Sequence, residues 1–130
     1  MIKTGFVHVI DDSPLLVKAM EMILTYEGLK VRGYPSAQAF LNGPCEAGCI
    51  VTDVEMPQMT GLELIAAMEE RDIRLPVIVA SGDFEPPAIR RALKCGAFDF
   101  LPKPFNAEAL VSAVEKALRG GPIEQINAAS

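Results

Sequence analysis

The sequence contains no tryptophan, and only 6% of its 130 residues are aromatic. Its core must therefore be mostly aliphatic, and Val, Ile, Leu and Ala cores are typical of parallel sheets that are covered on both faces. Half of the residues are hydrophobic, which at this length is enough for one compact domain. We therefore expect a single α/β domain.

Basic residues are fewer than acidic ones, 12 against 17, which gives a formal net charge of −5. Nucleic acids and anionic membrane surfaces both attract basic patches, so we expect no direct nucleic-acid binding and no membrane attachment. No apolar run approaches the roughly 18 residues of a membrane span, and residues 1–6 lack the pattern of a signal peptide. These absences favour a cytoplasmic location.

Cysteine and histidine are few, which argues against a zinc or redox centre. The three cysteines, Cys45, Cys49 and Cys95, do not have the paired spacing of zinc ligands, and we expect them to be reduced. A redox pair of Cys45 and Cys49 is the alternative, although their spacing differs from that of redox motifs. His8 lies among apolar residues, where a lone histidine is usually packed or at an edge, so we assign it no role.

What the sequence does contain is a regular alternation of short aliphatic runs with amphipathic stretches. This alternation indicates βαβ units and hence a parallel sheet with helices on both faces. We expect five strands, at about residues 6–10, 30–33, 49–52, 77–80 and 97–101. Each strand is followed by a helix, and the chain divides into a domain at 1–120 and a tail or linker at 121–130.

Capping residues and breakers mark most of the expected helices. Ser13 and Pro14 supply an N-cap and a first-turn proline, Ser36 begins a short helix, and Asn106 begins the last one. Gly28 and Gly96 end two of the helices. The expected apolar helix faces include Leu16, Ala19, Met20, Ile23, Leu24, Leu64, Ile65, Met68, Ile89, Ala92, Leu93, Leu110, Val114 and Leu118.

Polar residues fall at or just beyond the ends of four aliphatic strands. These residues are Asp11, Asp12, Asp53, Ser81 and Lys103. Ligands of an open parallel sheet bind beyond the carboxyl ends of its strands, so we expect the five side chains to converge. Three carboxylates would repel one another without a cation, and oxygen ligands of this kind suit Mg²⁺.

The same arrangement predicts phosphoryl chemistry. A carboxylate in such a site can act as a nucleophile and form an acyl phosphate. Mg²⁺ would neutralise the carboxylates and withdraw charge from the transferring group, while Lys103 and the Ser81 hydroxyl could bind the remaining phosphoryl oxygens.

At this point the sequence resembles a known family, the CheY-like receiver domains of two-component response regulators, over about residues 6–118. The sequences of its motifs are most similar to those of the FixJ-like branch, whose members usually carry a C-terminal helix-turn-helix DNA-binding domain. The motifs that carry the resemblance are Val9-Ile10-Asp11-Asp12-Ser13, Val51-Thr52-Asp53-Val54-Glu55-Met56-Pro57-Gln58-Met59-Thr60-Gly61, Ala80-Ser81-Gly82 and Ala97-Phe98-Asp99-Phe100-Leu101-Pro102-Lys103-Pro104-Phe105.

The resemblance implies a flavodoxin-like, doubly wound sheet of order 2-1-3-4-5 with five helices. It also implies a site in which Asp53 is the phosphoacceptor and Asp12 binds Mg²⁺ directly. Asp11 would act largely through water, and the backbone carbonyl of Glu55 would complete the protein ligands. Lys103 would pair with the phosphoryl group.

The resemblance further implies a conformational switch. Ser81 would move toward the phosphoryl oxygens and Phe100 would follow it inward, changing the surface made by the fourth helix, fifth strand and fifth helix. That surface could form a phosphorylation-dependent homodimer, and a sensor histidine kinase would be the phosphodonor. The bond between Lys103 and Pro104 would be cis, which an X-Pro bond adopts at low cost.

Three features differ from the commonest family pattern. Ser81 stands where threonine is more frequent, and Phe100 lacks the hydroxyl of the tyrosine often found there. Glu55 and Asp83 place acidic side chains near the mouth of the site, where either could steer an attacking water or repel phosphodonors.

Other functions are compatible with parts of this pattern. Paired acids often only cap a helix, and a single Lys or Ser at a strand end is usually structural. A phosphatase similar to the haloacid dehalogenases uses the same residue types, but its nucleophile follows the first strand, whereas the paired acids come first here. A receiver that binds partners without accepting phosphate is a third possibility. The chain could also be part of a longer transcription factor, with residues 120–122 as the junction.

Overall fold

The computed structural model describes residues 5–120, which form a parallel sheet with helices on both faces. The strands are β1 (Phe6–Ile10), β2 (Lys30–Tyr34), β3 (Gly48–Asp53), β4 (Val77–Ser81) and β5 (Asp99–Pro102). The helices are α1 (Pro14–Tyr26), α2 (Ala37–Leu41), α3 (Gly61–Glu70), α4 (Pro86–Lys94) and α5 (Ala107–Gly120).

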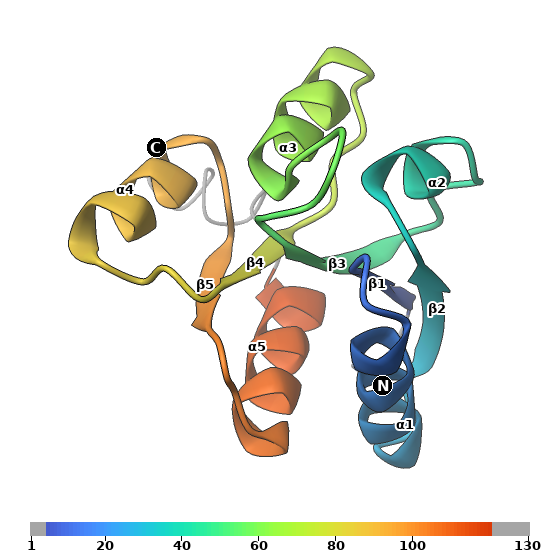
Figure 1. Cartoon of the computed structure of the whole chain (residues 1–130). Coiled ribbons are helices and arrows are strands. Elements are labelled where there is room, and N and C mark those ends of the chain that lie inside the picture. Colours follow the sequence, from blue (N-terminus) through green and yellow to red (C-terminus); the bar gives the residue numbers. More distant parts are fainter. Residues whose placement is uncertain (1–4, 121–130) are drawn as a thin grey trace.

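The strand order is β2-β1-β3-β4-β5, and all four strand pairs are parallel. Helices α1 and α5 cover one face of the sheet, while α2, α3 and α4 cover the other (Figure 1). Within residues 5–120 this is the predicted doubly wound architecture, with the predicted strand order and five helices, so the prediction of fold class is confirmed.

Strand β1 shows how the alternation of a buried strand builds two cores. Val7 and Val9 are fully buried in the cluster that includes α1 and α5. Ile10 belongs to the cluster on the opposite face, and the ring of His8 lies 5.0 Å from that of Phe40 in α2. Because successive side chains point to opposite faces, one strand contributes to both layers.

The helix starts follow the capping signals in the sequence. The Ser13 hydroxyl accepts a hydrogen bond from the Leu16 amide, and Pro14 is the first helical residue of α1. At α3, Thr60 and Glu63 form a reciprocal capping box. Gly28 follows the end of α1 with φ of 85°, a conformation in which glycine avoids the penalty of a side chain.

Some local predictions are wrong. Leu93 of α4 is 49% exposed, because α4 packs through the side that carries Ala92, the buried residue of that helix. Ala19 of α1 is exposed as well. Strand β5 begins at Asp99 rather than residue 97, because the Ala97 amide still donates to the Ala92 carbonyl oxygen at the end of α4. The predicted tail at 121–130 lies outside the described residues.

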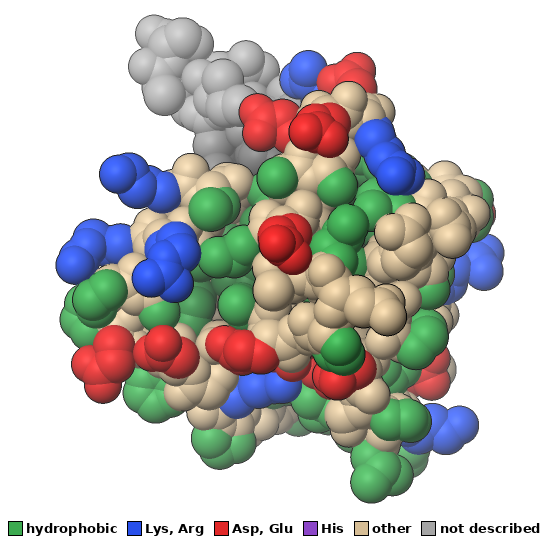
Figure 2. Space-filling view, turned by 45° about the horizontal axis from the view of Figure 1, so that its top comes forward, with side chains coloured by type: hydrophobic (Ala, Val, Ile, Leu, Met, Phe, Trp, Pro, Cys, Tyr) green, Lys and Arg blue, Asp and Glu red, His purple; other side chains and the backbone are tan. Residues whose placement is uncertain are grey.

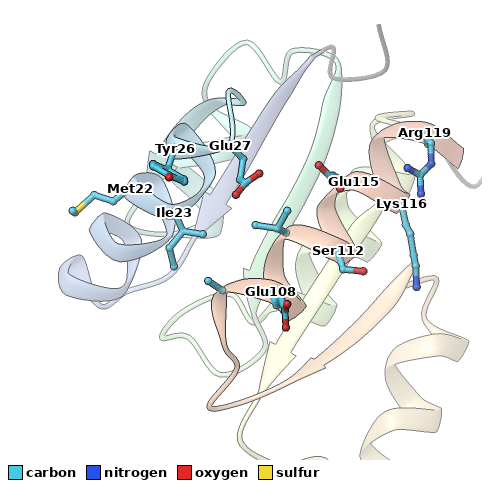
Figure 3. Close-up of a pocket in the computed structure, with 11 residues that line it drawn as sticks. Met22, Ile23, Tyr26, Glu27, Glu108, Ser112, Glu115, Lys116 and Arg119 are labelled. Carbon is cyan, nitrogen blue, oxygen red and sulfur yellow. The ribbon is translucent and has the colours of Figure 1, made fainter.

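A groove of about 640 Å³ runs between α1 and α5, on the face of the sheet opposite α3. Figure 3 shows Met22 and Tyr26 of α1 across this groove from Glu108 and Glu115 of α5. The polar residues singled out by the sequence do not line it. In the described part of the chain, no helix has both the length and the apolar character that crossing a membrane requires.

Candidate functional site

The predicted site residues lie at the carboxyl edge of the sheet, where four strands end. Asp11 follows β1, Asp53 and Ser81 are the last residues of β3 and β4, and Lys103 follows β5. Because the strands are parallel and in register, they end at the same edge of the sheet. There the Lys103 amide donates to the Ser81 carbonyl oxygen at 2.8 Å. Asp11, Asp53 and Ser81 are buried, whereas Asp12 is exposed.

The Lys103 ammonium connects two of the three aspartates. Its Nζ lies 3.3 Å from Asp11 Oδ2 and 3.2 Å from Asp53 Oδ1. The two carboxylates are almost completely buried, while the Lys103 side chain keeps 25% of its surface exposed. The Lys103 to Asp53 contact is an ion pair without well-directed hydrogen-bond geometry, and Asp53 Oδ1 has no other partner in the described chain.

Burial and charge act in opposite directions at Asp53. Burial raises the pKa of Asp53, the Lys103 charge lowers it, and the carboxylates of Asp11 and Glu55 raise it further, so the net shift is upward. Burial lowers the pKa of Lys103, but Asp11 and Asp53 outweigh it and the net shift is upward. The site thus contains more negative charge than one ammonium neutralises.

The three aspartates have the geometry of a cation site. One carboxylate oxygen from each of Asp11, Asp12 and Asp53 lies within 4.8 Å of the others. Carboxylates with room for water or phosphate oxygens are the ligands that Mg²⁺ accepts, and the weakly partnered, buried Asp53 Oδ1 is a suitable ligand atom. The residues present therefore fit a hard divalent cation.

Ser81 is held by residues on two neighbouring loops. Its hydroxyl donates to Glu55 Oε2 at 2.8 Å and accepts from the Asp83 amide at 3.0 Å. The sequence placed Glu55 near the mouth of the site but did not predict this hydrogen bond. The available signal was positional, because Glu55 lies two residues after the end of β3 and Ser81 ends the adjacent strand β4.

Phe100 lies on β5, opposite Val79 of β4 in the register of the sheet. Its side chain is partly buried and packs against the core cluster that contains Val79 and Ala92. The bond between Lys103 and Pro104 is cis, as the resemblance implied. His8 is fully buried and hydrogen-bonded, which confirms the interpretation of a packed histidine.

The surface around the site carries both signs of charge. Figure 2 shows acidic side chains in a row across this side of the molecule, and basic side chains gathered where α4 lies. The exposed basic residues of α4 are Arg90, Arg91 and Lys94.

The three cysteines, Cys45, Cys49 and Cys95, are free, as predicted.

A doubly wound sheet with an aspartate cluster and a lysine at its carboxyl edge defines a receiver domain. The family model "Response regulator receiver domain" matches residues 7–115, so the chain belongs to this family, as its motifs predicted. Members of the family are signalling switches of two-component systems, and aspartate phosphorylation and control of an output are typical of them.

The relatives agree with the predicted FixJ-like branch. The chain is 43% identical to the transcriptional regulatory protein FixJ of Azorhizobium caulinodans, over 86% of this chain and 54% of the relative. It is 36% identical to the response regulator protein TmoT of Ectopseudomonas mendocina, over 94% of this chain and 56% of the relative. The chain thus spans about half the length of these curated relatives.

A solved structure supports the same assignment at the level of the fold. The crystal structure of FixJ-N matches with a TM-score of 0.80 and 37% identity, covering 87% of this chain and 92% of the FixJ-N chain.

Proposed function

We propose that Asp53 accepts a phosphoryl group and that this modification switches the domain between two conformations. The observation that carries the proposal is the contact of one ammonium, Lys103 Nζ, with Asp11 and Asp53 beside a third carboxylate. A buried carboxylate with a cation on one side and a cation site on the other is suited to carry a dianionic phosphoryl group.

Asp53 is the nucleophile in this proposal. A carboxylate oxygen attacks the phosphorus, and the bond between phosphorus and the donor breaks, with the electron pair leaving on the donor atom. The donor is a phosphohistidine of a sensor histidine kinase or a small acyl phosphate. Lys103 and the Ser81 hydroxyl then bind phosphoryl oxygens, which stabilises the acyl phosphate.

The proposed ligands of Mg²⁺ are Asp11, Asp12, Asp53 and the backbone carbonyl of Glu55. When bound, the cation neutralises the carboxylates and withdraws charge from the transferring group. The chain's own contribution is to fix the carboxylates, because Asp11 is buried and its Oδ1 accepts from the Ser13 amide at 2.9 Å.

The switch proposal concerns Ser81 and Phe100. Movement of Ser81 toward the phosphoryl group vacates space beside β4, and Phe100 moves inward on the neighbouring strand. Phosphorylation shifts the equilibrium only if it binds one conformation more tightly than the other. We propose that the domain acts only on itself, through its own phosphorylation and slow dephosphorylation, and that its output is transcriptional, as the name of the FixJ relative suggests.

Intact mass spectrometry after incubation with Mg²⁺ and acetyl phosphate tests the proposal. We expect one added phosphoryl group that is lost when Mg²⁺ is removed by a chelator and in Asp53→Asn. Asp72→Asn is the matched control, because Asp72 is exposed and bonded to Arg74. Wild-type protein without an adduct would favour a receiver that binds partners without phosphate, and multiple turnovers of an external phosphoester would favour a phosphatase.

A further inference from the structure

The Ser81 hydroxyl has one proton, and that proton is already in use. It is donated to Glu55 Oε2 at 2.8 Å, and the hydroxyl oxygen accepts from the Asp83 amide. A serine hydroxyl is a single donor, so it cannot make a good hydrogen bond to a phosphoryl oxygen on Asp53 while it donates to Glu55. The two interactions therefore compete.

We propose that the Glu55 side chain is a positioning residue that stabilises the unphosphorylated conformation by holding the Ser81 hydroxyl. This inference rests on the proposed role of Asp53 as phosphoacceptor and adds a regulatory contact to that site. It concerns the side chain of Glu55, whereas the proposed Mg²⁺ ligand is its backbone carbonyl.

The surroundings explain why the contact favours one conformation. Ser81 is 2% exposed, so little water is available to replace a lost partner, whereas the exposed Glu55 carboxylate can return to solvent. A hydrogen bond with a charged acceptor is stronger than one between neutral groups. Glu55 also brings negative charge near Asp53, which opposes a phosphoryl group there whether or not Ser81 is involved.

These two effects can be separated by substitution. Glu55→Ala removes the acceptor and the charge, whereas Glu55→Gln removes the charge and keeps an acceptor oxygen of similar reach. If Glu55 acts through Ser81, the difference between the two variants depends on the Ser81 hydroxyl. It should therefore vanish when both substitutions are repeated in a Ser81→Ala background.

The experiment is a titration of each variant with beryllofluoride, a phosphoryl mimic, in saturating Mg²⁺, followed by amide NMR signals. We expect the midpoint concentration to fall about fivefold in Glu55→Ala and about twofold in Glu55→Gln. In the Ser81→Ala background we expect the Ala and Gln variants to have equal midpoints. Asp83→Asn is the charge control, because it removes a negative charge near the site while its side chain accepts from the Glu85 amide and not from Ser81, so its effect on the midpoint should be the same with and without the Ser81 hydroxyl.

The outcomes distinguish this inference from the function on which it rests. Wild-type protein that does not bind beryllofluoride with Mg²⁺ would overturn the role of Asp53. Binding by the wild type with equal midpoints for Glu55→Ala and Glu55→Gln would overturn the holding role of Glu55 and leave the phosphoacceptor in place. A difference that persists without the Ser81 hydroxyl would also overturn it.

Discussion

Lys103 is the residue on which the charge balance of the unphosphorylated site depends. It is the cation that contacts both Asp11 and Asp53, whose side chains are 3% and 8% exposed. Removing one partner from a buried ion pair leaves a charge that neither water nor protein stabilises. The cost is reduced here because Lys103 itself is partly exposed to solvent.

Lys103→Met should therefore lower the free energy of unfolding by about 2 kcal/mol without Mg²⁺. Added Mg²⁺ should restore more stability to this variant than to the wild type, because the ammonium no longer repels the cation. Urea unfolding with and without Mg²⁺ measures both effects. Lys18→Met, which removes an exposed lysine of α1, should change neither quantity. An equal response of Lys103→Met and the wild type to Mg²⁺ would contradict the prediction.

His8 is a buried titratable residue outside the site. Its Nε2 donates to the Glu46 carbonyl oxygen at 2.9 Å, and its Nδ1 lies 3.1 Å from the Tyr34 hydroxyl. Burial lowers the pKa of His8, Glu46 partly opposes this shift, and Arg32 adds to it. Because the unfolded histidine has a pKa of about 6.5, the unfolded state binds more protons as the pH falls below that value.

The free energy of unfolding should consequently decrease as the pH falls from about 6.5 toward the lowered pKa of folded His8, by at most about 1.4 kcal/mol per pH unit from this residue. His8→Gln keeps an Nε2 donor and cannot titrate, so its unfolding free energy should vary less over the same range. Chemical denaturation between pH 5 and 7 compares the two slopes. Parallel slopes would show that His8 does not contribute.

At the scale of elements, the start of α3 is packed against the end of β3. A Cβ atom at Gly61 would lie 2.5 Å from the Asp53 carbonyl oxygen, which is backbone and cannot easily move. The Gly61 amide also donates to the Val54 carbonyl oxygen at 2.9 Å. The position of Asp53 therefore depends on how closely this helix approaches its strand.

Gly61→Ala should lower the free energy of unfolding by about 2 kcal/mol and reduce the rate of phosphoryl uptake by displacing Asp53. Gly82→Ala is the control for stability, since a Cβ there would have no neighbour within 4 Å. Thermal unfolding and the mass assay measure the two effects. A Gly61→Ala protein as stable as Gly82→Ala would mean that the helix can shift without cost.

The sequence predicted elements well where a local signal was strong. Strand β1 was predicted to the residue, and the caps at Ser13, Ser36 and Asn106 are all present, because each depends on contacts within a few residues. The buried face of α4 was predicted only in part, because Ala92 is buried but Leu93 is exposed. Which of them is buried depends on how the helix packs against the sheet, and the spacing of apolar residues along the helix does not determine that packing.

The site followed the same division between local and tertiary information. The convergence of Asp11, Asp53 and Lys103 could be predicted because parallel strands end at a common edge. The hydrogen bond between Glu55 and Ser81 could not be predicted, because it depends on the rotamer of the long Glu55 side chain. That rotamer is fixed only when the loop after β3 packs beside the end of β4.

At the scale of the molecule, the surface formed by α4, β5 and α5 is our proposed site of phosphorylation-dependent dimerisation. Leu93 on α4 and Phe84 just before it are about half exposed, at 49% and 48%. Phe100, the proposed switch residue, lies on β5 within the same surface. A change at Phe100 would therefore reach this surface directly.

Leu93→Ser should weaken dimerisation about tenfold in the presence of Mg²⁺ and beryllofluoride, because a leucine buried in an interface contributes about 1–3 kcal/mol. Leu15→Ser is the matched control, since Leu15 is 84% exposed on α1, outside this surface. Sedimentation velocity measures the dimer fraction. Equal weakening by both substitutions would place the dimer surface elsewhere, and a monomer under all conditions would exclude dimerisation by this domain.

The contact of Lys103 with Asp11 joins residues 92 positions apart, at the two ends of the fold. Closing so long a loop is entropically slow, and during synthesis the amino-terminal strands leave the ribosome first. A nascent chain that has released β1 to β4 already carries the aspartates but lacks the ammonium that pairs with them. In the function proposed above, the phosphoacceptor site would therefore be complete only once β5 docks, and a partly synthesised chain would not accept a phosphoryl group before that point.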